Sequence, residues 1–146
     1  MSETVKFKCH ISASNPEKQL GLEIRLNDQQ VYNNSWVKES EIVECDLCVE
    51  DDSEYELHWI MYGKTNDHTE LDADGNIVND ALIEIKDVIL DDIELQHLFN
   101  EESTYKHNFN GNGNDTVEPF NNFMGCNGTV TMKFTSPFYL WLLEKM

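Results

Sequence analysis

The sequence lacks a long apolar run. The longest one covers residues 138–143, only six residues, whereas a helix needs about 20 apolar residues to cross a bilayer. No apolar stretch that could serve as an export signal follows Met1. These two features predict a protein that has no membrane partner and that folds inside the cell that makes it.

Basic residues are also scarce. Ten Lys and Arg stand against 28 Asp and Glu, so the formal net charge is −18. A surface this acidic repels phosphate backbones and anionic lipids, which argues against a nucleic-acid partner. It suits divalent cations or a basic protein surface instead. Because 40% of the residues are hydrophobic, the chain has enough apolar material to fold in spite of its charge.

Only four cysteines occur, and in a protein that is not exported we expect them to be reduced thiols. Cys45 and Cys48 have a CxxC spacing, but a zinc site usually combines two such pairs, and Cys9 and Cys126 are isolated. Residues three apart on a strand also point to opposite faces. We therefore interpret Cys45 and Cys48 as packed or surface thiols.

Catalytic motifs are missing as well. The five histidines do not cluster with a Ser or Cys nucleophile motif, and neither a GxSxG elbow nor an HExxH helix occurs. Paired carboxylates such as Asp51-Asp52 are adjacent in sequence, and neighbours on a strand diverge. The sequence therefore predicts no catalytic residue and no enzymatic activity.

Short segments of alternating apolar and polar residues dominate the chain, and this period of two is typical of half-buried strands. The clearest of these segments are 5–11, 20–26, 43–49, 55–61, 81–90 and 130–134. Eight or nine such strands without a long helix predict an all-β fold, an antiparallel β-sandwich of the jelly-roll-like kind. We expect a single domain covering residues 1–146.

Two details of strand geometry follow from this pattern. The apolar parity changes between Ile85 and Val88, which predicts a β-bulge, and Asp91-Asp92 predicts a tight turn after it.

The segments on either side of Asp51-Asp52-Ser53 are interpreted as the two strands of a hairpin. That register places Leu47 opposite Leu57 and Asp46 opposite His58. The Asp46–His58 pair would lie on the outer surface and contribute less than about 1 kcal/mol.

Residues 64–79 form the longest polar segment of the first half. Glu70, Asp72 and Asp74 occupy every second position before Gly75, an arrangement by which a loop can wrap a hard cation such as Ca²⁺. The remaining ligands would be Asn66, Asp67, Asp80 or main-chain carbonyls. A solvated acidic loop is the alternative interpretation, because carboxylates are common throughout the chain.

Residues 138–143 are apolar without interruption. They can close the core as a final strand or helical turn, or they can contact a partner, since contiguous exposed apolar surface usually marks an interface. The residues concerned are Phe138, Tyr139, Leu140, Trp141, Leu142 and Leu143.

The segment from Tyr62 to Asp67, the acidic loop and the strand that follows Asp80 resemble the calcium-dependent xylan-binding modules, over roughly residues 20–95. The resemblance implies a small β-sandwich in which Asn66, Asp67 and Asp80 hold calcium, and in which calcium contacts sugar hydroxyls. Amphipathic aromatic residues near the loop would stack on sugar rings. The candidates are Tyr32, Trp36 and Tyr62.

A second resemblance covers the whole chain. Segments 20–26, 124–134 and 139–144 resemble small proteins of tailed phages that infect marine cyanobacteria. This implies a viral origin, assembly in the host cytoplasm and a place in the virion. The first interpretation is therefore a non-enzymatic accessory structural or adsorption component, which contacts other virion proteins or a second copy of itself through residues 138–143. The alternative is a calcium-dependent carbohydrate-binding module.

Overall fold

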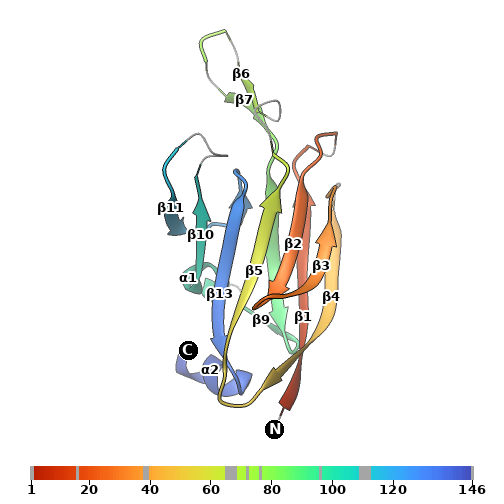
Figure 1. Cartoon of the computed structure of the whole chain (residues 1–146), viewed down its shortest axis with the longest axis vertical. Helices are drawn as coiled ribbons and strands as arrows, with labels where there is room; N and C mark the ends of the chain where they lie inside the picture. The colour runs from red at the N-terminus through yellow and green to blue at the C-terminus, as the bar shows by residue number, and fades with distance from the viewer. Residues whose placement is uncertain are drawn as a thin grey trace.

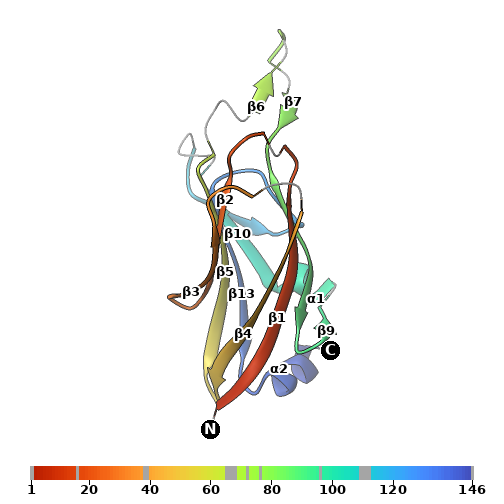
Figure 2. The same cartoon turned by 90° about the vertical axis from the view of Figure 1, so that its right-hand side faces the viewer.

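The computed structural model describes residues 2–15, 17–37, 40–64, 69–71, 73–75, 77–95, 97–108 and 113–145. Two antiparallel β-sheets lie face to face, and Figure 2 shows the two layers from the edge. The predicted fold class, an all-β sandwich, is thus confirmed. No helix in the described ranges has the length and apolar character needed to cross a membrane.

The first sheet has five strands, in the order β12-β8-β1-β4, with β9 paired to β8. These strands are β1 (Ser2–Ala13), β4 (Glu41–Glu50), β8 (Ile83–Leu90), β9 (Ile93–Glu94) and β12 (Phe123–Met124). The second sheet has six strands, in the order β11-β10-β13-β5-β2-β3. They are β2 (Gly21–Leu26), β3 (Gln29–Asn34), β5 (Glu54–Tyr62), β10 (Ser103–His107), β11 (Thr116–Pro119) and β13 (Gly128–Thr135).

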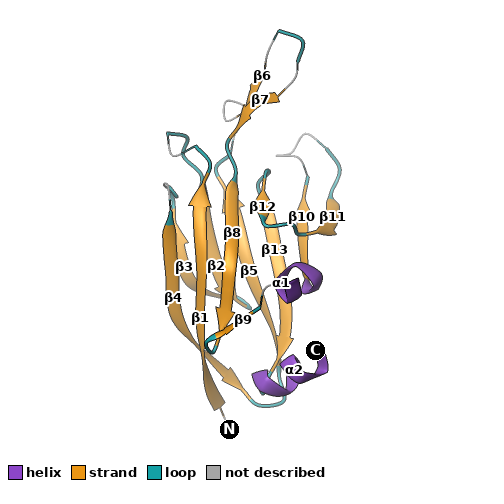
Figure 3. Cartoon of the chain, turned by 180° about the vertical axis from the view of Figure 1, so that it is seen from behind, coloured by secondary structure: helices purple, strands orange, loops and turns teal. Residues whose placement is uncertain are grey.

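A separate hairpin, β6 (Thr69–Leu71) and β7 (Ile77–Asp80), projects from one end of the sandwich, which we call the hairpin end (Figure 1). Helix α1 (His97–Glu102) connects β9 to β10. Helix α2 (Phe138–Lys145) follows β13 and lies at the opposite end, which we call the helix end (Figure 3).

The core lies between the sheets and is built from the alternating apolar residues of both. Phe7 of the first sheet and Trp59 and Phe134 of the second are almost completely buried. The ring centroids of Phe7 and Trp59 lie 6.0 Å apart, so these side chains pack directly across the sandwich. The period-two pattern therefore predicted correctly which face is buried in the long strands β1, β2, β4, β5, β8 and β13.

The predicted hairpin between residues 43–49 and 55–61 is wrong. Strand β4 pairs with β1 in the first sheet, whereas β5 pairs with β2 and β13 in the second. Asp46 lies opposite Lys6, and His58 lies opposite Thr131, whose Oγ1 is 2.9 Å from His58 Nδ1. Two consecutive strands show the same alternation whether they pair side by side or face each other across a core, so the pattern could not distinguish these cases.

The predicted bulge and turn are confirmed. Asp87 has a φ of 53° and is exposed between the buried residues Ile85 and Val88. The register between β1 and β8 shifts at the same level, between Lys8 and His10. Asp91 and Asp92 also have positive φ values, 51° and 63°, and make the tight turn from β8 to β9.

The described residues form thirteen strands rather than eight or nine. The additional ones are short: β9 and β12 have two residues each, too few for an alternating pattern to be recognised. β9 and β12 extend the first sheet, whereas the short strands β6 and β7 form the separate hairpin.

Candidate functional site

The candidate site lies at the hairpin end, on the outer face of the second sheet. Strand β5 ends there at Tyr62, and the chain continues toward β6 and β7 (Figure 1). The ring of Tyr62 lies across Gly21 of the neighbouring strand: a Cβ atom on Gly21 would come within 2.8 Å of Tyr62 Cδ2. The absence of a side chain on Gly21 is therefore what allows the ring to lie against β2.

A hydrogen bond fixes the far side of the same ring. The Tyr62 hydroxyl donates to Asn33 Oδ1 on β3, at 2.6 Å. Tyr62 thus spans three strands, from β5 across β2 to β3. Beside it is an open hollow of about 490 Å³ that is lined by Gln19, Ser35, Tyr62 and Gly63. The result is an amphipathic ring held in one orientation next to a space that a small polar ligand can enter.

The residues after Tyr62 hold the start of the polar segment in place. Gly63 has a φ of 87°, a conformation that favours glycine. Lys64 is buried, and Asn127 binds both of its backbone groups: Asn127 Oδ1 accepts from Lys64 N and Asn127 Nδ2 donates to Lys64 O, each at 2.9 Å. The Lys64 ammonium donates to Gly125 O. Residues 125–127 thus anchor the point at which the chain leaves the sandwich.

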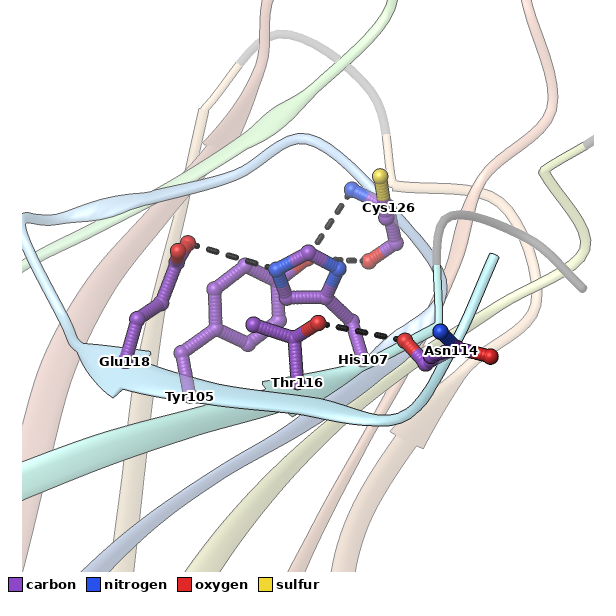
Figure 4. A network of polar contacts seen from close by, with 6 residues as sticks. All are labelled: Tyr105, His107, Asn114, Thr116, Glu118 and Cys126. Atoms are coloured by element: carbon purple, nitrogen blue, oxygen red, sulfur yellow. Dashed lines mark hydrogen bonds and ion pairs between the residues drawn. The ribbon is translucent and has the colours of Figure 1, made fainter. Parts of the chain in front are cut away.

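That anchor is itself held by the network in Figure 4. The Tyr105 hydroxyl accepts from Cys126 N at 2.9 Å and donates to Cys126 O. Burial raises the pKa of Tyr105 well above its usual range, so the hydroxyl remains a donor at any physiological pH. The His107 ring lies against Tyr105, with centroids 4.7 Å apart, and its Nε2 is 3.3 Å from Glu118 Oε1. We interpret this network as structural support for the hairpin end.

The predicted calcium ligands lie mostly outside what the structure describes. Asn66, Asp67 and Asp72 are outside the described residues, and for Glu70 and Asp80 only the backbone is described. The β6–β7 register pairs Glu70 with Asn79 and Thr69 with Asp80. Asp74 is exposed. Among the described residues, no three His, Cys, Asp or Glu side chains gather closely enough to hold a metal ion.

The three predicted sugar-stacking residues have different environments. Trp36 is exposed, and its backbone N–H donates to Asn34 Oδ1 at 3.0 Å. Tyr32 is half-buried and packs against the core cluster, and its hydroxyl donates to Glu41 Oε2 at 2.9 Å. Tyr62 alone among the three lines the hollow described above.

The structure buries three of the residues 138–143 and exposes the other three, so part of the segment closes the core and the partner contact stays a prediction. Phe138, Trp141 and Leu142 are buried in the core cluster. The other three, Tyr139, Leu140 and Leu143, are exposed. The four cysteines are free, and Cys45 is half-buried whereas Cys48 is exposed, as expected for opposite faces of β4.

Sequence reasoning missed Gly21, Asn33 and Asn127. A glycine inside a strand is a known sign that another group approaches the backbone closely, so Gly21 carried a signal that could have been used. The two asparagines carried none, because their roles depend on contacts with residues 29 and 63 positions away.

No protein-family model matches the chain, and no curated protein matches it. Two solved structures match the chain. One is a structure of vCBM60 in complex with galactobiose, with 10% identity over 87% of this chain and 96% of that one and a TM-score of 0.47. The other is the selenomethionine form of vCBM60, from work on a circular permutation that links two families of calcium-dependent carbohydrate-binding modules. It has a TM-score of 0.52 and 8% identity, over 88% of this chain and 89% of that one, so the two share their fold.

Proposed function

We propose that this protein is a non-enzymatic carbohydrate-binding module whose binding site is the hairpin end. The observation that carries the proposal is the position of Tyr62. Its ring lies across Gly21, its hydroxyl is hydrogen-bonded to Asn33, and it lies beside an open hollow. The fold that the chain shares with a calcium-dependent carbohydrate-binding module supports the same proposal.

The chemistry of sugars fits this geometry. One face of many sugar rings presents C–H groups, which pack on an aromatic ring, while the hydroxyls at the edge need hydrogen-bonding partners. The polar residues Gln19 and Ser35 line the hollow next to Tyr62, and Gln19 Nε2 donates to Ser35 O at 3.2 Å. Because the tyrosine ring is already fixed by β2 and β3, stacking costs little additional side-chain entropy. Trp36 is the second aromatic residue of the proposal, and Tyr32 is left out because it packs against the core.

We propose calcium as the cofactor because of the composition of the loop that follows Lys64. Asn66, Asp67, Glu70, Asp72, Asp74 and Asp80 supply the oxygen ligands that Ca²⁺ prefers. This loop begins directly after the anchored residue Lys64, two positions beyond Tyr62. An ion bound there would attract sugar hydroxyls and reduce the local excess of negative charge.

A glycan array that includes xylan-derived oligosaccharides tests the proposal, once with millimolar calcium and once with a chelator. We expect binding that depends on calcium and that is at least tenfold weaker in Tyr62→Ala. The matched control is Phe123→Ala, because Phe123 is an exposed aromatic residue on the other sheet. Silence on the array with calcium present, or equal binding by Tyr62→Ala, would refute the proposal.

The role in a phage particle stays a prediction. Mass spectrometry of purified particles and of the remaining lysate tests it, and the protein should be enriched in the particles. A carbohydrate-binding module can act on a virion or elsewhere, so the outcome of this experiment is independent of the glycan array.

A further inference from the structure

Helix α2 presents a compact apolar face to solvent. Tyr139, Leu140 and Leu143 are 50%, 59% and 67% exposed. Tyr139 and Leu140 precede Leu143 by four and three residues, so the three side chains lie next to one another on the helix surface. The other exposed large hydrophobic residues of the described chain are dispersed over separate elements: Trp36, Ile42, Val117 and Phe123. The α2 face is therefore the one place where several of them gather.

The helix that carries this face is firmly attached. Phe138 and Trp141 pack on Phe134 of the core, with ring centroids 6.3 Å and 6.2 Å from it. Glu3 Oε1 accepts from Phe138 N at 2.9 Å and from Ser136 Oγ at 3.1 Å, which fixes the first turn to β1. The exposed side chains therefore belong to a rigid surface rather than to a frayed end.

Carboxylates lie next to the apolar face, both near Leu140 and near Tyr139. A hollow of about 320 Å³ beside Leu140 is lined by Asp52, Glu54 and Glu144, among others. Near Tyr139, Asp91 raises the pKa of the tyrosine hydroxyl by its negative charge, with smaller effects from Asp92 and Glu3. The one basic residue of α2, Lys145, is paired with Glu102 at 3.3 Å.

We propose that Tyr139, Leu140 and Leu143 form a docking surface for a partner-protein segment that presents apolar side chains flanked by Lys or Arg. The apolar contact supplies the driving force, and the acidic rim selects a basic partner. A second copy of this chain is disfavoured, because it would bring another net charge of −18 against the same rim. The surface lies at the helix end, so a partner there leaves the hairpin end free (Figure 3).

Fluorescence anisotropy with two labelled peptides of equal length tests the proposal at physiological salt. One is an amphipathic Leu/Lys helix, and the other has Glu in place of Lys. We expect the Leu/Lys peptide to bind and the Leu/Glu peptide not to bind. The double variant Leu140→Ser/Leu143→Ser should lower the affinity at least tenfold, and Glu54→Gln/Glu144→Gln should lower it several-fold. The control variant Ile42→Ser/Val117→Ser removes exposed apolar residues from other elements and should bind as the wild type does.

Three results would overturn the proposal. If Leu140→Ser/Leu143→Ser binds the Leu/Lys peptide as tightly as the wild type, the attraction is only the general acidity of the chain. If neither peptide binds at millimolar concentration, the face is not a docking surface of this kind. If sedimentation equilibrium shows a dimer that the same variant abolishes, the occupant is a second copy. Because Leu140 and Leu143 are exposed, an unchanged melting temperature should confirm that the variant is folded.

Discussion

Tyr62 and Gly21 are matched across two adjacent strands. Gly21 of β2 pairs with Tyr62 of β5, and the tyrosine ring occupies the space that a side chain at position 21 would need. Gly21 does not have a positive φ, so its backbone conformation does not require glycine. Glycine is required at position 21 for steric reasons. The space that it leaves lets the ring lie against β2, within hydrogen-bonding distance of Asn33.

Replacing Gly21 by alanine is expected to displace the Tyr62 ring and break its hydrogen bond to Asn33. Glycan affinity should fall about tenfold, or ~1.4 kcal/mol, because the stacking surface is no longer held in place. The free energy of unfolding should fall by about 1 kcal/mol. Isothermal titration calorimetry and urea unfolding measure the two effects.

Gly125→Ala is the matched control for that variant. A Cβ atom on Gly125 would meet nothing within 4 Å, and its carbonyl, which accepts from Lys64, is retained. We expect this variant to bind and unfold like the wild type. Wild-type affinity in Gly21→Ala would contradict the role given to the position of the ring.

Asn127→Ala should loosen the anchoring of Lys64, the residue at which the chain leaves the sandwich. The substitution removes two hydrogen bonds to the backbone of Lys64 and leaves buried groups without those partners. We expect the free energy of unfolding to fall by about 1–3 kcal/mol. Asn114→Ala, at an exposed position in another loop, should change it by less than about 0.5 kcal/mol. Equal stability of the two variants, measured by urea unfolding, would show that the two hydrogen bonds from Asn127 to Lys64 do not contribute to stability.

The alternation of side chains was sufficient to predict the sandwich, because burial of one face is a property of each strand by itself. Phe7, Trp59 and Phe134 are buried where that alternation placed them. Which strands pair with each other depends on two segments at once, so the alternation within one segment does not predict it. The turn at Asp52 shows this: its N–H donates to Ser136 O, at the end of β13, and the chain there crosses from one sheet to the other.

The candidate site could be predicted only in part for a similar reason. Tyr62 was identifiable as an amphipathic aromatic residue near the acidic loop. Its fixed orientation depends on Gly21 and Asn33, which lie on strands distant in sequence. Contacts of this kind follow from the register of β2, β3 and β5, and that register was not available from the pattern of any single segment.

Alkaline pH should destabilise the protein through Cys9. Burial raises the pKa of the Cys9 thiol from 9.0 to about 12. The unfolded chain loses this proton near pH 9.0 while the folded chain keeps it, so the folded state binds more protons between these values. The free energy of unfolding therefore falls as the pH rises above 9.0, by at most about 1.4 kcal/mol per pH unit from this group. At lower pH this thiol makes no contribution to the pH dependence.

Urea unfolding of Cys9→Ala and of the wild type between pH 9.0 and 10.0 isolates this effect, because tyrosines with a raised pKa, such as Tyr32, contribute to the pH dependence of both proteins. The variant is expected to be less stable overall, because it leaves a small cavity, but its stability should fall less steeply with pH. Cys48→Ala, at an exposed position, should keep the wild-type slope. Identical slopes for Cys9→Ala and the wild type would rule out Cys9 as the source.

Calcium should stabilise the folded protein if the loop binds it. A ligand that binds only the native state stabilises it by about 2.7 kcal/mol at a concentration of one hundred times its dissociation constant, so the melting temperature should rise by several degrees relative to a chelator. Asp72→Asn/Asp74→Asn should abolish this rise, because each substitution removes a charged ligand. Asp115→Asn, in a different loop, should retain it. A rise that persists in the double variant would place the ion elsewhere, whereas no rise at millimolar calcium would remove calcium from the proposal and leave Tyr62 to bind sugar without it.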